Sequence, residues 1–252
     1  MRGAITLWKL ELLRAAKAPV LIASTLATPL VWLVLFGTMF RDGVGVRFQG
    51  FDYLTFMAPG LMILMASLYA LSSGTRTMAD KQVGFLKEVL VAPVGRMEVI
   101  VGRALGICTI VTAQALIILG VPALLGEGPP VPYGALSIAG IAAAVSLVAL
   151  GFTGLGMMMA TQGKNPQSFA AAIGALTLPM FFLSGALVPI ANLPAWARGL
   201  ATVNPMAYAV DLTRQAALGT GVGHFPLALA ALGLLGFALV ALSAGAKHLR
   251  AE

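Results

Sequence analysis

The 252-residue sequence contains few charged residues. Only 10% of its residues are Asp, Glu, Lys or Arg, whereas 59% are hydrophobic. A water-soluble domain is typically about 25% charged and about 45–50% apolar. The chain therefore has too little polar surface to enclose a soluble core of its length, and we expect lipid to be its solvent.

Cysteine and histidine are also scarce. Cys108 is the single cysteine, and the two histidines are His224, at the end of a predicted span, and His248, in the tail. A structural zinc site needs four Cys or His ligands, and a disulfide needs a second cysteine. The sequence thus predicts no metal site and no disulfide framework. It also offers no histidine inside a helix bundle that could activate a nucleophile, so we expect no enzymatic activity.

The phosphate-binding motif G-x-x-x-x-G-K-[ST] is missing. The Gly163-Lys164 pair is followed by Asn165 and lacks the first glycine at the required spacing. The predicted spans also contain no Asp, Glu, Lys or Arg, which secondary carriers use for ion coupling. We therefore expect no cofactor in this chain, and an energy source outside it.

Charged residues separate six uncharged stretches, each long enough for a membrane helix. A stretch of 23 residues forms a helix of roughly 34 Å, and the hydrocarbon core of a bilayer is about 30 Å thick. The predicted spans are about 18–40, 53–75, 104–126, 133–161, 167–188 and 224–246. The sequence therefore predicts an all-α integral membrane protein, with one six-span transmembrane domain over residues 1–252.

Basic residues are concentrated on one side of these spans. Of the 16 Lys and Arg residues, 12 fall in segments on the side of the N-terminus. The positive-inside rule then places both termini in the cytoplasm, and we expect a multi-pass protein of the inner (cytoplasmic) membrane. Because anionic membrane lipids account for the net charge of +7, we expect no nucleic-acid partner.

Apolar residues recur at helical spacing within residues 1–17. This stripe consists of Ile5, Trp8, Leu12 and Ala16. A cleaved signal peptide has an uninterrupted apolar core, but charged residues interrupt this one. We predict an amphipathic helix on the membrane surface, with Trp8 at the interface. A charged tail with a few aliphatic residues is the alternative.

The cytoplasmic connection from Arg76 to Arg103 is much longer than a helix hairpin needs. Within it, Phe85, Leu86, Val89 and Leu90 form one apolar face. This pattern predicts a short amphipathic helix that ends at Pro93. The residues alone fit two positions for this helix, on the lipid surface or docked on a cytosolic partner.

The outer region that follows the fifth span is apolar but is interrupted by prolines. Short helices that dip back toward the membrane fit this pattern better than a span, and a plain extracellular loop is the alternative. Pro194 is suited to the first turn of one such helix. Asn204 is suited to the N-cap of another, which Pro205 would begin.

Methionine and aromatic residues in several spans offer a polarizable surface suited to an amphipathic cargo. We place Phe56, Met62, Tyr69, Phe181 and Phe182 on a candidate substrate path, together with Met65, Met157–Met159 and Met180. For each of them, helix packing or lipid contact is the alternative. Gly151, Gly154 and Gly156 predict close helix packing.

Two patterns in these loops resemble the signatures of type-2 ABC exporter membrane subunits of the daunorubicin-resistance kind. The cytoplasmic pattern contains Gly84, Phe85, Leu86, Lys87, Glu88, Leu90, Pro93 and Arg96. The outer pattern contains Pro189, Pro194, Trp196, Asn204, Pro205, Tyr208, Asp211 and Arg214. The resemblance extends in order over nearly the whole chain. Gly95 departs from it, because the family usually has a small polar residue there.

The resemblance implies an ATP-driven export function. In such transporters the cytoplasmic segment is a coupling helix that docks on an ABC ATP-binding subunit, where ATP and Mg bind. Two re-entrant helices precede the last span. A homodimer of the membrane subunit would carry a lipid-like, amphipathic drug-like or glycan substrate between its second and fifth spans. The alternatives are a non-transporting membrane scaffold or passive channel that binds a cytosolic protein through residues 80–96, and, less supported, a lipid-modifying enzyme.

Overall fold

A computed structural model describes residues 2–43, 47–48, 50–82, 96–124, 134–163 and 165–248. Nearly all of them are helical, as the sequence predicts. The long helices are α2 (Pro19–Gly43), α3 (Tyr53–Gln82), α5 (Arg96–Leu124), α6 (Ala135–Gln162), α7 (Pro166–Phe182) and α10 (Leu227–His248). The short elements are α1 (Arg2–Ala16), β1 (Arg47–Phe48), β2 (Phe51–Asp52), η1 (Ile190–Asn192), α8 (Ala195–Ala201), α9 (Pro205–Leu218) and η2 (Thr220–Val222).

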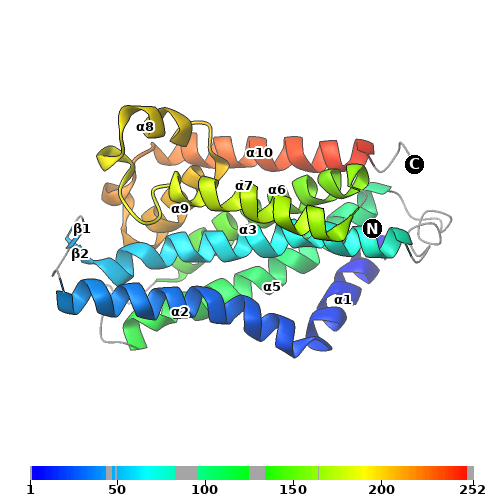
Figure 1. Ribbon diagram of the computed structural model, residues 1–252, viewed down its shortest axis with the longest axis horizontal. Helices are drawn as coiled ribbons and strands as arrows, with labels where there is room; N and C mark the ends of the chain where they lie inside the picture. Colours follow the sequence, from blue (N-terminus) through cyan, green and yellow to red (C-terminus); the bar gives the residue numbers. More distant parts are fainter. Residues whose placement is uncertain are drawn as a thin grey trace.

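The long helices form an elongated bundle with different elements at its two ends (Figure 1). The helix α1 and the last turns of α10 lie at one end, which we call the α1 end. The hairpin of β1 and β2, together with α8 and α9, lies at the opposite end, which we call the α9 end. Between them α2 and α3 run antiparallel (Figure 1). The first turns of α2 therefore lie beside the last turns of α3.

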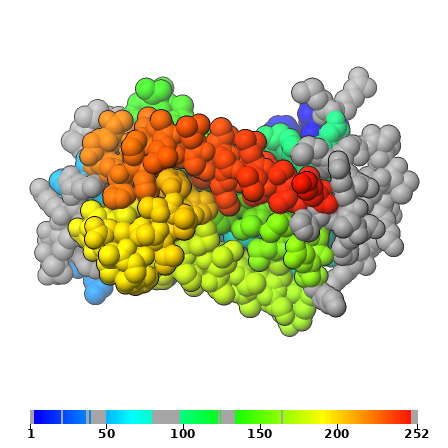
Figure 2. Space-filling view, turned by 90° about the horizontal axis from the view of Figure 1, so that it is seen from above, coloured from blue at the N-terminus to red at the C-terminus, as the bar shows by residue number. Residues whose placement is uncertain are grey.

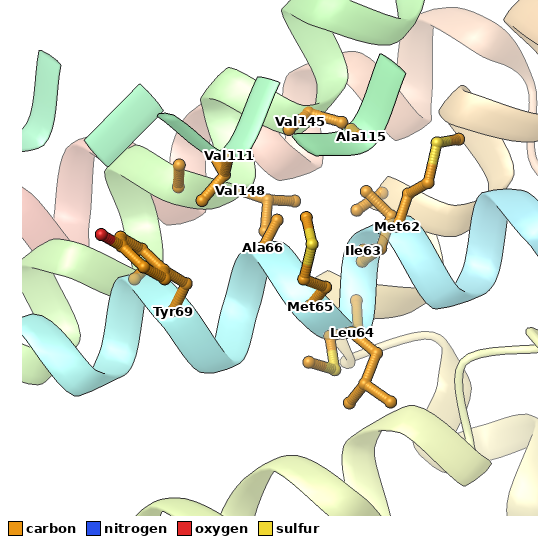
Figure 3. Close-up of a cluster of buried hydrophobic side chains, with 14 of the residues drawn as sticks. Met62, Ile63, Leu64, Met65, Ala66, Tyr69, Val111, Ala115, Val145 and Val148 are labelled. Carbon is orange, nitrogen blue, oxygen red and sulfur yellow. The ribbon is translucent and has the colours of Figure 1, made fainter. Parts of the chain in front are cut away.

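Helix α3 is the centre of the bundle. It packs against α2, α5, α6, α7 and α9, and nearly all its residues from Tyr53 to Leu71 are buried. Figure 3 shows Leu64 on the side of α3 that faces α7, whereas Val111 and Val148 cover another side from α5 and α6. A helix that is apolar on all sides is typical of the core of a bundle.

Glycines bring α6 close to its neighbours. A Cβ atom on Gly154 would lie 2.6 Å from the backbone of Ala241 in α10, and one on Gly156 would lie 2.6 Å from the carbonyl oxygen of Leu71 in α3. One on Gly151 would lie 2.4 Å from the ring of Phe237. The predicted role of these three glycines in close helix packing is confirmed. Figure 2 shows α10 exposed along one face of the molecule, with α8 beside its first half.

Four helical segments in the described part of the chain are long and apolar enough to cross a membrane: Tyr53–Ala79, Glu98–Pro122, Ala135–Gln162 and Leu227–Lys247. Ile22–Phe36 in α2 and Pro166–Phe182 in α7 are shorter apolar helices. The 17 residues of α7 span roughly 25 Å, at the lower limit for a crossing helix. The structure therefore shows several candidate spans, and the count of six stays a prediction.

Two predicted helix ends differ from the structure. The helix predicted over 167–188 ends at Phe182, because Gly185 adopts a left-handed conformation with φ of 79° and the Ser184 hydroxyl donates to the Phe181 carbonyl. The helix predicted from His224 begins at Leu227 instead. There the backbone N–H groups of residues 224 and 225 are bonded to Asp211, so these residues stay outside the helix.

The connection predicted from Arg76 to Arg103 is shorter than expected, because both arginines lie inside helices. Arg76 donates to the Glu11 carboxylate and Arg103 to the Thr77 hydroxyl inside the bundle. Arg76 therefore marks the end of α3 too early along the sequence, and Arg103 marks the start of α5 too late. The coupling residues Gly84, Phe85, Leu86, Lys87, Glu88, Leu90 and Pro93 lie outside the described residues. Arg96 is the first residue of α5.

Candidate functional site

A groove of about 530 Å³ opens between α2, α3 and α7. Its apolar part includes Trp32 from α2, Leu61, Leu64 and Met65 from α3, and Ile173 from α7. A volume of this size is typical of small-molecule sites, which are mostly apolar with a few placed polar groups. No charged side chain is among the residues described along this groove.

Hydroxyl groups gather in one part of the groove. They come from the first turns of α2, with Ser24, Thr25 and Thr28, and from the last turns of α3, with Tyr69, Ser72 and Thr75. Because α2 and α3 run antiparallel, both groups lie toward the α1 end of the bundle (Figure 1). The groove is therefore amphipathic along its length, with an apolar middle and a polar part near α1.

An ion pair between α1 and α3 lies behind this polar part. The Arg76 guanidinium donates to the Glu11 carboxylate at 3.0 Å and to the Tyr69 hydroxyl oxygen at 3.1 Å. Arg14 lies 3.9 Å from the other Glu11 oxygen. Glu11 is only 2% exposed, so its charge depends on these partners. A buried carboxylate without them would be strongly destabilising.

Glu11 reaches this position because α1 packs closely on α5. A Cβ on Gly102 would lie 2.6 Å from the carbonyl oxygen of Ala4, and one on Gly106 would lie 2.5 Å from the Glu11 Cβ. The face of α1 that packs on the bundle therefore contains Ala4 and Glu11, whereas Ile5 of the predicted apolar stripe is exposed. A helix is present as predicted, and the contact of its apolar stripe with the membrane surface stays a prediction.

A second polar network holds the α9 end together around Asp211. Its carboxylate accepts hydrogen bonds from the backbone N–H of His224 at 2.7 Å and of Phe225 at 2.9 Å. The Gln215 amide donates to the same carboxylate at 2.9 Å and to the Phe225 carbonyl at 3.0 Å. Asp211 thus ties α9 to the turn that precedes α10.

Arg214 lies one turn further along α9 and is 4% exposed. It donates to the Gly185 carbonyl at 3.0 Å and to the Phe56 carbonyl at 3.3 Å, and its guanidinium carbon lies 3.8 Å from the centre of the Phe56 ring. Burial lowers the pKa of Arg214 to about 10, while the charge of Asp211 opposes this shift. Arg214 therefore remains charged at neutral pH and joins α9 to α3 and to the end of α7.

The other residues of the outer pattern begin and pack the short helices. The Asn204 side chain accepts from the Met206 N–H and donates to the Met180 carbonyl, so it is the N-cap that the sequence predicts, with Pro205 as first residue. Tyr208 donates to the Thr202 carbonyl. Pro194 takes the N-cap position of α8, one residue before the predicted one.

The remaining residues of this pattern lie near the surface. Trp196 on α8 is 67% exposed. Pro189 directly precedes η1. The structure shows that α8 and α9 are helices of 7 and 14 residues. Whether they re-enter a membrane stays a prediction.

The residues of the predicted substrate path fall in three places. Tyr69 and Met65 line the groove, although both are nearly fully buried. Phe56, Met62 and Phe181 are buried in the core. Phe182 is 52% exposed at the end of α7. Of the other methionines, Met157 is buried and Met158, Met159 and Met180 are half-buried.

Comparison with known proteins shows the family to which the sequence belongs. The sequence model of the ABC-2 type transporter matches residues 3–218, which is most of the chain. The chain belongs to the ABC-2 type transporter family. Membership of this family supports a function as a membrane transport permease and implies an ABC ATP-binding partner.

Relatives of this ABC-2 type chain carry permease names. The ycf38 protein of Pyropia yezoensis, named as a transport permease, is 29% identical over 80% of this chain and 69% of its own length. The inner membrane transport permease YadH of Escherichia coli strain K12 is 26% identical over 77% of this chain and 76% of its own. YbhR of the same strain, named as a multidrug ABC transporter permease, is 24% identical over 65% of this chain and 44% of its own.

The sequence-based prediction does not include several residues that form or support this groove. Glu11 and Arg76 are 65 positions apart, and no local pattern indicates that they pair. Trp32 and the hydroxyls of α2 and α3 resemble ordinary span residues in the sequence. The recurrence of Ser24, Thr25 and Thr28 on one helical face is the signal that could have indicated a polar surface.

Proposed function

We propose that this chain is the permease subunit of an ATP-driven ABC exporter and that the groove between α2, α3 and α7 is part of its substrate path. The groove is the observation that carries the proposal. It combines an apolar wall with hydroxyl groups at one end, and this combination suits a lipid-like, amphipathic drug-like or glycan substrate better than an ion.

The proposed arrangement in the membrane has six crossings, with α2 and α7 as the two shorter ones. The position of α1 and the last turns of α10 at the same end of the bundle supports an even number of crossings (Figure 1). The excess of basic residues supports a cytoplasmic α1 end in the inner membrane. We include a homodimer in the proposal, because the family resemblance implies one.

The proposed ATPase docking site is the segment between α3 and α5. Helix α3 ends at Gln82 and α5 begins at Arg96, and both of these helix ends lie at the α1 end of the bundle (Figure 1). The Glu11–Arg76 pair joins α1 to α3 only two turns before that point. Movement of the docked segment would therefore be passed directly to α3, which forms one wall of the groove.

Transport by the reconstituted complex tests this proposal. The chain is purified with the P-loop ATPase that accompanies it, and ATP-dependent movement of fluorescent lipids and amphipathic dyes is measured in proteoliposomes. We expect Ala170→Trp, which fills the groove from α7, to lower transport by roughly tenfold. Ala143→Trp is the matched control, because Ala143 is an exposed alanine in the first half of α6 and is not among the lining residues of this groove.

The same assay separates the proposal from a channel or scaffold. A passive channel would move substrate without ATP, and a scaffold would bind an ATPase without any transport. Either result, or equal transport by the Ala170→Trp and Ala143→Trp variants, would contradict the proposed substrate path.

A further inference from the structure

The Tyr69 hydroxyl has a defined orientation in the polar part of the groove. Its oxygen accepts a hydrogen bond from the Arg76 guanidinium at 3.1 Å. Because an arginine has no acceptor, the phenolic hydrogen of Tyr69 must be donated elsewhere. The hydroxyl points away from the Met62–Met65 cluster (Figure 3). Tyr69 is among the lining residues although its side chain is only 2% exposed, so its phenolic hydrogen is a donor for a ligand that reaches the polar part of the groove.

The aliphatic hydroxyls of the groove have the opposite character. Ser72 donates to the Tyr69 carbonyl at 2.7 Å, and Thr25 donates to the Ile22 carbonyl at 2.9 Å. Thr28 lies 3.4 Å from the Ser24 carbonyl in the same kind of contact. These hydrogens are directed to the backbone of their own helices. The Thr25 oxygen already accepts from the Gln114 amide at 3.0 Å, so the acceptors offered to a ligand are chiefly the Ser72 and Thr28 oxygens. The polar part thus combines one donor with these acceptors.

Charge on a ligand would find no partner here. The described lining of the groove has no charged side chain, and Arg76 behind it is already paired with Glu11 at 3.0 Å. Transfer of an unpaired charge into such a site costs far more than transfer of a hydrogen-bonded polar group. Because the charges of Arg76 and Glu11 already compensate each other, the pair offers no unpaired charge to a cationic or an anionic head group.

We propose that the groove selects amphiphiles with an uncharged head group that both accepts and donates hydrogen bonds, and that Tyr69 is the residue that recognises the head group. The apolar part of the ligand would lie against Trp32, Leu64 and Met65. Arg76, held by Glu11, is a positioning residue, because it fixes the direction of the Tyr69 hydroxyl. This inference rests on the proposed function of the groove as a substrate path.

Tryptophan fluorescence of the full chain in phosphatidylcholine nanodiscs tests this inference. Trp32 lines the groove, so Trp8→Phe and Trp196→Phe leave it as the single tryptophan of the three in the chain. The probes are three amphiphiles with the same brominated 12-carbon chain and a glycerol ester, trimethylammonium or sulfate head. A second reporter carries Leu232→Trp with all three native tryptophans replaced by Phe. Because Leu232 is exposed on α10, this reporter measures partition into bulk lipid.

The ratio of quenching at Trp32 to quenching at the Leu232→Trp reporter measures preference for the groove. We expect the glycerol ester to have a ratio several-fold above those of both charged probes. Tyr69→Phe should lower the ratio for the glycerol ester by about two- to tenfold, the range for one hydrogen bond. Ser72→Ala is the control, because it removes a hydroxyl whose hydrogen is donated to the backbone. It should lower the ratio for the glycerol ester less than Tyr69→Phe does.

Glu11→Gln distinguishes a positioning role of Arg76 from a merely structural one, because only the positioning role predicts a change in which head group is preferred. It removes the carboxylate partner of Arg76, so the sulfate probe should gain preference for the groove while the trimethylammonium probe does not. Equal ratios well above one for the three heads, or an unchanged ratio in Tyr69→Phe, would overturn the inference and leave the proposed function standing. Ratios near one for every probe would contradict the groove as a binding site, and with it the proposed substrate path.

Discussion

Asp211 and Arg214 lie about one turn apart on α9 and are both buried, yet they bind different partners. Asp211 accepts backbone and side-chain donors near the start of α10, whereas Arg214 donates to carbonyls of α3 and of the turn after α7. Buried backbone N–H and C=O groups in turns between helices lack partners within a helix. They need other hydrogen-bond partners, because water does not reach them. Asp211 therefore satisfies two N–H groups ahead of α10, whereas Arg214 satisfies a carbonyl of the turn after α7 and joins this turn to α3.

The first prediction concerns Arg214. In Arg214→Met the carbonyls of Phe56 and Gly185 lose their donor, and we expect the free energy of unfolding to fall by about 1–3 kcal/mol. Thermal unfolding of the purified chain in one detergent measures this. Arg214→Lys keeps the charge but cannot donate to several carbonyls in fixed directions, so its stability should lie between those of the wild type and Arg214→Met. Wild-type stability in both variants would show that these hydrogen bonds contribute little.

At the scale of helices, the sequence predicts helix ends best where neighbouring residues alone determine them. Asn204 and Pro205 predict the start of α9, because capping is decided by neighbouring residues. The sequence does not predict the end of α7. The helix ends where Gly185 adopts a left-handed conformation and lies close to Ile190, and a sequence does not reveal a φ angle. Arg76 suggests a helix end, but Glu11, distant in sequence, neutralises it inside the helix.

The second prediction tests how closely α6 and α10 pack. Gly154→Ala would place a Cβ 2.6 Å from the backbone of Ala241. Backbone atoms cannot move aside as a side chain can, so the helices must separate, and we expect a loss of about 1–3 kcal/mol of stability. Gly236→Ala in α10 is the matched control, because its Cβ would meet no atom within 4 Å. There the better helix propensity of alanine should increase stability by up to about 1 kcal/mol.

Thermal unfolding of the two alanine variants side by side provides the measurement. Equal melting temperatures would mean that the crossing of α6 and α10 tolerates a methyl group. In that case the glycines of α6 would serve another purpose than close packing.

At the scale of the whole molecule, composition and charge predict a helical membrane protein, because these properties are sums over the chain. The candidate groove was less accessible to prediction. Side-chain chemistry predicts Tyr69 and Met65 on the substrate path, and both line the groove. The same chemistry predicts Phe56 and Phe181 there, but these two lie in the core. Which face of a buried helix borders a groove depends on the packing of α2 and α7, and this packing has no signal in a single sequence.

The third prediction concerns orientation in the membrane. Thr220 lies beside α9 and Gln162 ends α6, so we expect the first outside the cell and the second in the cytoplasm. In a Cys108→Ala background, Thr220→Cys should react with an impermeant maleimide in intact cells. Gln162→Cys should react only after the cells are opened. The reverse pattern would contradict the positive-inside assignment and the cytoplasmic position of both termini.

The fourth prediction concerns coupling to the ATPase and involves Glu88, which lies outside the described residues. If residues 84–93 dock in a cleft of the partner, Glu88→Arg places like charges in a partly desolvated contact, which costs several kcal/mol. Transport should then fall strongly, and ATP hydrolysis should lose its response to substrate. The protein should still insert and keep its stability, because Glu88 lies outside the predicted spans.

A helix that merely lies on lipid predicts a different outcome for Glu88→Arg. An added positive charge would strengthen its contact with anionic lipid, so transport and substrate-stimulated ATP hydrolysis should stay at wild-type levels. Lys87→Ala is the control, because it removes a neighbouring charge without creating repulsion. Since the chain has no phosphate-binding loop, all ATP hydrolysis in these assays should disappear when the partner is left out. Activity that persists in the purified permease alone would contradict the division of labour on which the coupling proposal depends.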